Sequence, residues 1–351
     1  MNNIHFFRPV LSLASLLFVL VSCDKDDDTP AEPVSRLYVS NADTGPSIQN
    51  LEVYNNADAG LSNPVKVASG ASDGNGVVYD AGRNILFQAG RMSKTIFYFS
   101  NAGMLTSGSI PSGSFTDAGL SSARDIAYDG GSNTLFVANN TDSTLRIYAG
   151  ASSATGNVSG RVVKLSAQPW GIFYEKDNNR LLVLMDNAAM RIEVFNNPAS
   201  LTAGLATPNS VLNISDRPNG GKSRLHGLTY SSKLDVLLVT EIGEAAAPAV
   251  PDLTKPAFNA DGGIYIIENA GAKLTAGGNV SANRTIYGSN TMMGNPVDIA
   301  FDDRDNKRLI YIAEKANKKL LVFKLSDNGN VSPSITTDVM TLPEAIYLDA
   351  R

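Results

Sequence analysis

The stretch Ala123–Ala151, ARDIAYDGGSNTLFVANNTDSTLRIYAGA, decides the fold of this chain. It contains three runs of apolar, aromatic and β-branched residues, at Asp125–Tyr128, Leu135–Ala138 and Leu145–Tyr148, and the segments between them are rich in Gly, Ser, Asn and Asp. Such runs, bounded by turn-forming residues, predict three short strands. A single small sheet of this kind does not bury both of its faces, so it needs copies beside it.

The same pattern recurs along the chain, and an aromatic residue ends the first run of each copy. These aromatics are spaced 49, 46, 56, 71 and 46 residues apart, at Tyr79, Tyr128, Tyr174, Tyr230, Phe301 and Tyr347. Three residues before each aromatic stands a glycine or a carboxylate: Gly76, Asp125, Gly171, Gly227, Asp298 and Glu344. Repeats of roughly 40–50 residues with several strands each are typical of β-propellers.

The two ends of the chain complete each other in this pattern. The first copy begins with Arg36–Asn41 and lacks a first strand, whereas Glu344–Leu348 reads as a first strand with no partners after it. Pairing of these two segments closes the ring without leaving an exposed edge. We therefore predict an all-β domain at residues 36–351, a six-bladed β-propeller of four-stranded blades closed by pairing of the C-terminal strand with the N-terminal blade.

Two of the second runs resemble a known repeat. The sequences LFVANN at residues 135–140 and IYIAE at residues 310–314 are similar to NHL-type repeats, and residues 36–351 as a whole resemble a six-bladed TolB-like propeller. The resemblance implies the fold. It leaves the function open, because this superfamily includes scaffolds, receptors and enzymes.

The charge composition argues against nucleic-acid partners. The chain carries 29 Lys and Arg against 34 Asp and Glu, a formal net charge of −5 over 351 residues. Binding to a phosphate backbone needs an excess of clustered Lys and Arg. We therefore expect no nucleic-acid partner.

The N-terminal residues predict export and lipid attachment. An apolar run, Val10–Val21, follows Arg8 and ends just before Cys23. The sequence Leu20–Cys23 resembles a bacterial lipobox, whose cysteine is acylated and becomes the first residue after cleavage. Residues 1–22 are therefore predicted to be a lipoprotein signal peptide. An uncleaved membrane anchor, the alternative, would need roughly 20 apolar residues, more than this run supplies.

The segment after Cys23 is acidic and contains prolines. Residues 23–35 are predicted to form an extended tether from the lipidated cysteine. They resemble the acidic tracts that direct some lipoproteins to the outer cell surface, and a plain spacer is the alternative. We expect a lipoprotein attached to the outer membrane through its lipid, exposed at the cell surface or otherwise facing the periplasm. Cys23 is the only cysteine, so the propeller has neither a disulfide nor a catalytic thiol.

Candidate binding residues gather where the predicted first strands begin. In propellers of this kind, the loops that enter the first strands and those that join second to third strands lie on one face, the top face, around the mouth of a central channel. The candidate ligand-binding residues there are Arg124, Asp125, Trp170, His226, Glu241, Asp298 and Glu344.

The acids Asp125, Asp298 and Glu344 have two interpretations. Converging carboxylates could hold a divalent cation such as Ca²⁺, the only cofactor that the sequence suggests. Alternatively, each acid accepts hydrogen bonds from the backbone N–H groups of its own loop. Arg124 could likewise bind a ligand carboxylate or pair with a neighbouring acid.

His226 and Trp170 also have a functional and a structural interpretation. His226 is the only histidine after the predicted cleavage site, which excludes a zinc site with two or more imidazoles. A Ser-His-Asp triad with Ser231 or Ser232 needs only one histidine, although no Gly-x-Ser-x-Gly motif is present. Trp170 would either stack on a sugar ring or an apolar ligand, or pack between blades.

These observations favour a non-catalytic lipoprotein that binds a protein or glycan partner through its top-face loops. The alternative is a metal-dependent lactonase-like or esterase-like hydrolase, which a resemblance to gluconolactonase-like six-bladed enzymes implies. Those enzymes surround a metal in the channel mouth with Glu, Asp and Asn side chains, and the metal polarises the carbonyl. Here Asn75 is the only asparagine at a first-strand mouth position. A purely architectural component of the envelope is the third hypothesis.

One loop of the top face is unusually long. The insertion Ile242–Asp261 contains three prolines, where equivalent loops have three to five residues. It predicts a flap over a mouth edged by Trp170, His226 and Glu344. The alternative is an outward excursion on the rim of its blade.

Overall fold

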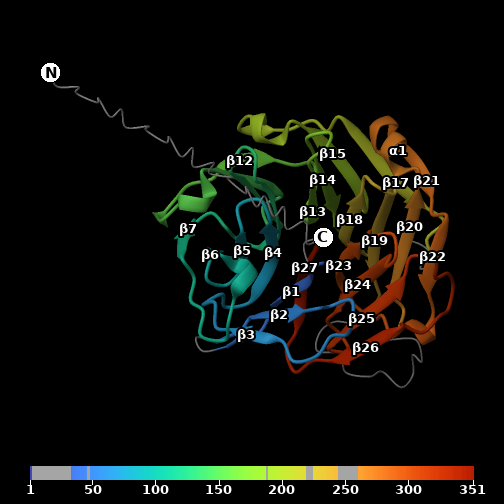
Figure 1. Cartoon of the computed structure of the whole chain (residues 1–351). Helices are drawn as coiled ribbons and strands as arrows, with labels where there is room; N and C mark the ends of the chain where they lie inside the picture. The colour runs from blue at the N-terminus through green and yellow to red at the C-terminus, as the bar shows by residue number, and fades with distance from the viewer. Residues whose placement is uncertain (2–32, 46–47, 187–188, 219–223, 244–259) are drawn as a thin grey trace. The chain divides into compact units, whose positions relative to one another are not determined.

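Six small sheets stand side by side around a common axis in the unit Val34–Arg351 (Figure 1). The computed structural model describes residues 1, 33–45, 48–186, 189–218, 224–243 and 260–351. The prediction of an all-β, six-bladed propeller is confirmed, and each blade is a sheet of four or five strands. The predicted signal peptide and the predicted tether up to residue 32 lie outside the described residues.

Each blade is built from four antiparallel strands that run outward from the axis. The first strands are β4 (Gly74–Asp80), β8 (Ala123–Asp129), β13 (Pro169–Glu175), β18 (Arg224–Ser231), β23 (Pro296–Asp302) and β27 (Pro343–Ala350). The second strands, in the same blade order, are β5 (Ile85–Gly90), β9 (Thr134–Asn139), β14 (Arg180–Met185), β19 (Val236–Ile242), β24 (Leu309–Glu314) and β1 (Ser35–Asn41). The third strands are β6 (Thr95–Ser100), β10 (Thr144–Ala149), β15 (Arg191–Asn196), β20 (Gly263–Glu268), β25 (Lys319–Lys324) and β2 (Leu51–Asn55). The fourth strands are β7 (Gly113–Thr116), β12 (Arg161–Lys164), β17 (Ser210–Ser215), β22 (Arg284–Tyr287), β26 (Ile335–Asp338) and β3 (Val65–Val67).

The order of the blades around the axis is fixed by contacts between neighbouring first strands. β4 contacts β8, followed in turn by β13, β18, β23 and β27, which contacts β4 again. Blades three places apart therefore face each other across the axis. The opposed first strands are β8 and β23, β13 and β27, and β4 and β18.

The second strands are continuous apolar runs because neighbouring blades cover both of their faces. On β14, Leu182 packs in a cluster with Leu228 of the β18 blade, whereas the adjacent Leu181 packs with Phe136 of the β9 strand. The apolar core is accordingly divided into six clusters, each formed between two blades. Burial on both faces removes the alternation of polar and apolar residues that a half-exposed strand would show.

The recurring aromatic of the first strands completes a turn. Each turn residue has a positive φ, and its side chain accepts a hydrogen bond from the tyrosine hydroxyl five residues earlier. The pairs and their distances are Tyr79–Asn84 at 3.0 Å, Tyr128–Asn133 at 2.7 Å, Tyr174–Asn179 at 3.1 Å and Tyr230–Asp235 at 2.9 Å. Asn and Asp tolerate the left-handed conformation better than other non-glycine residues.

Short parallel strands connect the outer edges of several blades. β11 (Gly156–Asn157) pairs with β7, β16 (Gly204–Leu205) pairs with β12, and β21 (Gly278–Ser281) pairs with β17. Each comes from the connection between the third and fourth strands of the following blade, as does the short helix α1 (Ala270–Ala276). The sequence patterns did not predict these strands or β7. Among the described residues, no helix is long and apolar enough to span a membrane.

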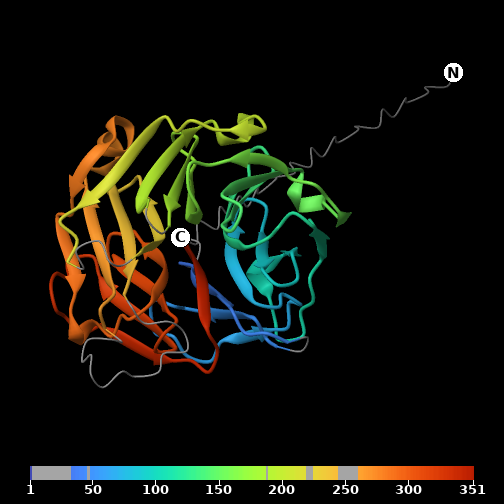
Figure 2. The same ribbon diagram turned by 180° about the vertical axis from the view of Figure 1, so that it is seen from behind.

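The C-terminal strand closes the ring as the sequence predicts. β27 pairs with β1 from Ser35↔Ala350 to Asn41↔Pro343. Val34 and Arg351 add two backbone hydrogen bonds of 2.8 and 2.9 Å at the end of the ladder. Figures 1 and 2 show the blue β1 and the red β27 side by side, although they lie at opposite ends of the unit.

Deletion of Pro343–Arg351 should destabilise the whole propeller, because it removes the first strand of one blade and exposes an edge of β1. We expect a loss of at least about 4 kcal/mol in the free energy of unfolding, beyond the range of ordinary point substitutions. The measurement is chemical and thermal unfolding of the truncated chain, with a chain that begins at Val34 and keeps its C-terminus as the control. Equal unfolding midpoints in the two chains would contradict this role for β27.

Candidate functional site

A β-bulge lies at the same place in every first strand. The pairing of each first strand with its second strand shifts register near its start, and the bulged residues are Asn75, Arg124, Trp170, His226, Val297 and Glu344. A bulge turns one side chain away from the regular alternation of a strand, a common arrangement near functional sites. Here it brings four of the predicted site residues together on the top face.

The centre of this cluster is a stack of three side chains. The indole ring of Trp170 lies against the imidazole of His226, with 3.6 Å between ring centroids and an interplanar angle of 8°. The guanidinium carbon of Arg124 lies 4.2 Å from the centroid of the Trp170 ring. These described neighbours cover the indole, and a stack with a cation on an aromatic ring contributes about 0.5–2 kcal/mol. Binding of a sugar on the Trp170 ring would therefore have to displace Arg124 or His226.

Glu344 neutralises the cationic side of the cluster. Its carboxylate is 3.7 Å from Arg124 and also forms an ion pair with Lys315. Burial alone would raise the pKa of Glu344, but the charges of Lys315 and Arg124 outweigh burial and hold it below its ordinary value. Glu344 is therefore ionised at neutral pH.

His226 is buried and neutral. Only 2% of it is exposed, and burial lowers its pKa even though Asp186 lies 3.6 Å from its Nε2 atom. Ser231 and Ser232 lie at the opposite end of β18, where they donate hydrogen bonds to Asp303 and Asp177. The structure thus places neither serine of the suggested triad beside His226.

Glu241 occupies a position that also recurs, at the end of a second strand. It forms an ion pair of 3.0 Å with Arg217 and accepts a hydrogen bond from Tyr265. Its counterpart in the next blade, Glu314, accepts hydrogen bonds from three backbone N–H groups of the adjoining loops. This correspondence indicates that Glu241 has a structural part in holding the top-face loops.

Asp125 and Asp298 join neighbouring first strands. Asp125 accepts hydrogen bonds of 2.8 Å from the N–H of Ile126 and from that of Ile172 on the next strand. Asp298 does the same with its own strand and with Ile346, at 2.8 and 2.7 Å. The two acids therefore bond backbone N–H groups, as their structural interpretation requires, and they reach the next blade as well as their own strand.

Glycines replace the acids where two first strands approach most closely. A Cβ atom on Gly171 would lie 2.3 Å from the His226 carbonyl oxygen, and one on Gly76 would lie 2.5 Å from the Ile126 nitrogen. Separations this short are not sterically tolerated. The alternation of Gly and Asp thus reflects the packing of first strands.

The predicted position of Glu344 in this alternation is wrong by one residue. The pairing of Tyr347 with Tyr38, and of Ala127 with Phe136, places Ala345 rather than Glu344 at the Gly-or-Asp position. Glu344 instead occupies the bulge. The three-residue spacing between Glu344 and Tyr347 matches the other copies only by coincidence, because the last copy has Leu348 at the recurring aromatic position.

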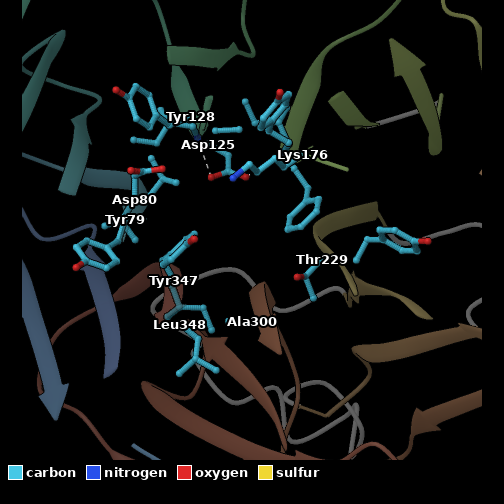
Figure 3. Close-up of a pocket in the computed structure, with 18 of the residues that line it drawn as sticks. Tyr79, Asp80, Asp125, Tyr128, Lys176, Thr229, Ala300, Tyr347 and Leu348 are labelled. Atoms are coloured by element: carbon cyan, nitrogen blue, oxygen red, sulfur yellow. Dashed lines mark hydrogen bonds between the residues drawn. The ribbon is translucent and has the colours of Figure 1, made fainter. Parts of the chain in front are cut away.

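The cavity of the propeller lies below these acids, on the side of the bottom face. It has a volume of about 660 Å³ and extends from Asp125 and Asp298 to the turns between first and second strands. Figure 3 shows Asp125, Thr229, Ala300 and Tyr347 around it. Loop lengths pointed to the top face, where Arg124, Trp170 and His226 form their stack, whereas the cavity lies on the other side of the acids.

The two acids form a coupled pair at the inner end of the cavity. Burial raises the pKa of Asp125 to about 7, although two backbone N–H groups favour its ionised form. Burial, followed by the charge of Asp125, raises the pKa of Asp298 well above its ordinary value. Both side chains keep some area exposed. Both shifts favour the protonated form of these acids.

The three acids of the predicted cation site do not converge on one point. Among the described residues, no group of three or more His, Cys, Asp or Glu side chains is placed to hold a metal ion. Asp125 and Asp298 project from opposed strands, and Glu344 is engaged by Lys315 and Arg124. The predicted flap of Ile242–Asp261 falls largely on residues 244–259, which lie outside the described residues.

Sequence reasoning missed three residues of the site. Asp186 follows a second strand and had no recurring signal. Phe173 and Tyr347 line the cavity. The sequence contained a signal for Phe173 and Tyr347. Each stands two residues after the Gly-or-Asp position of its strand, and residues two apart lie on the same side of a strand.

Comparison with known proteins supports the fold but identifies no family for this chain. No protein-family model matches the sequence, and no curated protein matches it. Among solved structures, a candidate 6-phosphogluconolactonase from Bacteroides uniformis aligns with a TM-score of 0.59 and 12% identity, covering 90% of this chain and 99% of that chain. The periplasmic gluconolactonase of Pseudomonas aeruginosa aligns at 0.57 and 11% identity, with coverages of 90% and 99%. A chain of the nidogen–laminin complex aligns at 0.58 and 12%, with coverages of 90% and 98%.

The raised pKa values of the acid pair predict a pH-dependent stability. A carboxyl that binds its proton more tightly in the folded chain stabilises the fold at low pH and loses that contribution as pH rises from about 4 to beyond 7. We expect the melting temperature of Asp298→Asn to decline less than that of the unmodified chain between about pH 5 and pH 8. Calorimetry across this range is the measurement.

Asp305→Asn, at a side chain that is 74% exposed, is the matched control and should keep the slope of the unmodified chain. Glu314, whose pKa burial also raises to about 7, is present in all three chains and cancels in the comparison. Parallel curves for Asp298→Asn and the unmodified chain would show that the two acids are not coupled.

Proposed function

We propose that this protein is an envelope lipoprotein that binds a small organic molecule in the central cavity of its propeller. The observation that carries the proposal is the cavity itself. Its volume of about 660 Å³ lies within the roughly 300–1,000 Å³ of small-molecule sites, and apolar and aromatic walls surround a few polar groups. Rigid first strands carry these groups, so binding requires little reorganisation of the backbone.

The charges around the cavity narrow the class of ligand. Its lining includes five carboxylates, Asp80, Asp125, Asp129, Asp298 and Asp303, but only two cationic side chains, Arg83 and Lys176. Even with one proton shared by the coupled pair, negative charge predominates. Phosphate recognition uses clustered Arg, Lys or free N–H groups, so a phosphorylated ligand is disfavoured. We therefore expect a neutral or cationic ligand of about the size of a sugar.

Hydrolysis of a lactone is the second candidate. Two of the similar structures carry gluconolactonase names, and a carboxyl pair that exchanges a proton near pH 7 is suited to general acid–base catalysis. In such a reaction one ionised carboxylate would take a proton from the attacking water, and the protonated carboxyl would donate to the leaving oxygen. A substrate for this chain would be an unphosphorylated lactone.

The proposed location follows from the N-terminal sequence. Cys23, acylated after cleavage, would hold the propeller at the outer membrane, facing the outside or the periplasm. The top-face loops, with the cluster around Arg124, are proposed as the surface for a protein or glycan partner. This surface is separate from the cavity, which is reached from the bottom face.

Blocking the cavity should abolish ligand binding. Thr229→Trp places an indole inside the cavity, whereas Thr336→Trp makes the same exchange at an exposed position of β26 and serves as the control. The measurement is calorimetry with a chain that begins at Val34, against neutral sugars, their phosphates, aliphatic and aromatic amines, and glucono-δ-lactone. We expect an unphosphorylated compound to bind. Its affinity should fall at least about tenfold in Thr229→Trp and stay unchanged in Thr336→Trp.

Binding that survives in Thr229→Trp would place the site elsewhere. Turnover of glucono-δ-lactone above the spontaneous rate, lost in both Asp125→Asn and Asp298→Asn, would favour the hydrolase. Binding of the lactone without turnover would favour the binding protein.

Substitution of Cys23 tests the membrane attachment. Cys23→Ala removes the proposed site of acylation, and two or more acyl chains are what make anchoring stable. We expect Cys23→Ala to be absent from the membrane fraction and to incorporate no labelled palmitate. The conservative exchange Cys23→Ser should give the same result. Unchanged recovery in salt-washed membranes would contradict the lipoprotein assignment.

A further inference from the structure

The cavity combines two opposed aromatic rings with two opposed carboxyl groups. We propose that its ligand is a ring-shaped molecule carrying a protonated amine, held between Phe173 and Tyr347 with the amine directed at Asp125 and Asp298. The inference rests on the proposed function, because it names the class of ligand for the same cavity.

The aromatic pair follows from the register of the first strands. The shared bulge places six residues of the cavity lining at one level of the first strands, namely Val78, Ala127, Phe173, Thr229, Ala300 and Tyr347. Phe173 and Tyr347 are the two aromatic members, and they lie on β13 and β27, which face each other across the ring. The other four side chains are small. At this level of the lining, the aromatic side chains thus come from two opposed first strands.

Tyr347 differs from the other tyrosines of the first strands. Those at the recurring aromatic position donate their hydroxyl to an Asn or Asp of the following turn. Tyr347 stands one residue earlier in register and extends into the cavity (Figure 3). Its hydroxyl has no hydrogen-bond partner among the described residues. A partly buried phenol without a partner is a group that a ligand can satisfy.

The acid pair lies one level deeper, toward the top face. Asp125 stands two residues before Ala127 on β8, and Asp298 stands two residues before Ala300 on β23, so both carboxyls share the axial side of their strands. The remaining positions of that level are Gly76, Gly171, Gly227 and Ala345. Because glycine and alanine add almost no side-chain volume, the inner end of the cavity presents the two acids and little else.

An organic cation would interact favourably with both the aromatic pair and the acid pair. Aromatic walls attract an organic cation through their π faces, and a charge between two carboxyls relieves their mutual repulsion. The charged groups that face the pair from the bottom are Asp80, Arg83, Asp129, Lys176 and Asp303, and those nearest it on the top side are Arg124, His226 and Glu344. Arg83 is engaged with the carbonyl of Gly130 at 2.7 Å, and Glu344 neutralises Arg124. Five carboxylates of the lining outnumber its two cationic side chains, Arg83 and Lys176, so the net charge around the cavity is negative.

Matched pairs of small molecules test this directly. Benzylamine and benzyl alcohol share an aromatic ring, cyclohexylamine and cyclohexanol share a saturated one, and each pair differs by amine against hydroxyl. At a pH above the raised pKa values of both acids, we expect each amine to bind at least about tenfold more tightly than its alcohol. The preference should shrink toward one at about pH 5.5, because both amines stay charged while the carboxyls take up protons. Calorimetry in two buffers of different ionisation heat should also show proton release on binding of the amine near neutral pH.

Variants of the two levels separate the contributions. Asp298→Asn should remove the preference for the amine, whereas Asp305→Asn should keep it. Tyr347→Phe should weaken binding only slightly, because it keeps the π face and removes the hydroxyl alone. Tyr347→Leu and Phe173→Leu should weaken it by about tenfold, since leucine fills space without a π face. Thermal unfolding of each variant establishes that it is folded.

Each outcome bears on one of the two proposals. Alcohols that bind as well as the amines, or a preference for amines that survives in Asp298→Asn, would overturn the amine assignment while leaving a ligand-binding cavity in place. The amine assignment would also be overturned if sugars bind and none of the four ring compounds binds at concentrations up to about 10 mM. Failure of every compound, neutral and cationic, to bind the unmodified chain would overturn the proposed function as well.

Discussion

Pairing of β27 with β1 is the constraint on which the rest of the structure depends. The only cysteine of the chain precedes the propeller, so the ring is closed by backbone hydrogen bonds and by packing between blades. Closure fixes which first strands face each other. The opposition of Asp125 to Asp298, and of Phe173 to Tyr347, is a property of the closed ring, because residues 173 and 174 positions apart are brought to the same level only when the last strand joins the first blade.

The two ends of the channel have different physical characters. At the top face the charges are matched, since Arg124 and Lys315 meet Glu344, and Trp170 fills the space between Arg124 and His226. At the bottom face the charges around the cavity are mostly negative, and an open volume remains. Paired charges in a closely packed site favour rigidity. Unpaired charges around a cavity attract a ligand of opposite charge. This contrast supports the proposal of a small-molecule site below the acid pair.

The sequence was sufficient to predict the blades, their number and the closing strand, because turn chemistry and apolar second strands are local signals. It was also sufficient to bring Arg124, Trp170, His226 and Glu344 to one face. The exact register was not predictable from spacing, since counting back from an aromatic does not detect that the last copy has Leu348 in place of Tyr. As a consequence, Tyr347 was grouped with the recurring aromatics that end the first strands, whereas it stands one residue earlier in register and lines the cavity. Loop length gave no indication of the cavity below the acid pair, because residues of the first strands and of the turns after them line it.

The position of β1 within its blade has a mechanical consequence. β1 is flanked by β27 on one side and β2 on the other, so hydrogen-bond ladders hold it along both edges. Tension applied through the N-terminal end of β1 would therefore load two ladders in shear, many bonds at a time, instead of peeling one edge bond by bond. A chain pulled from this end should resist unfolding more strongly than one pulled from an outer strand such as β3, which pairs along one edge among the described residues.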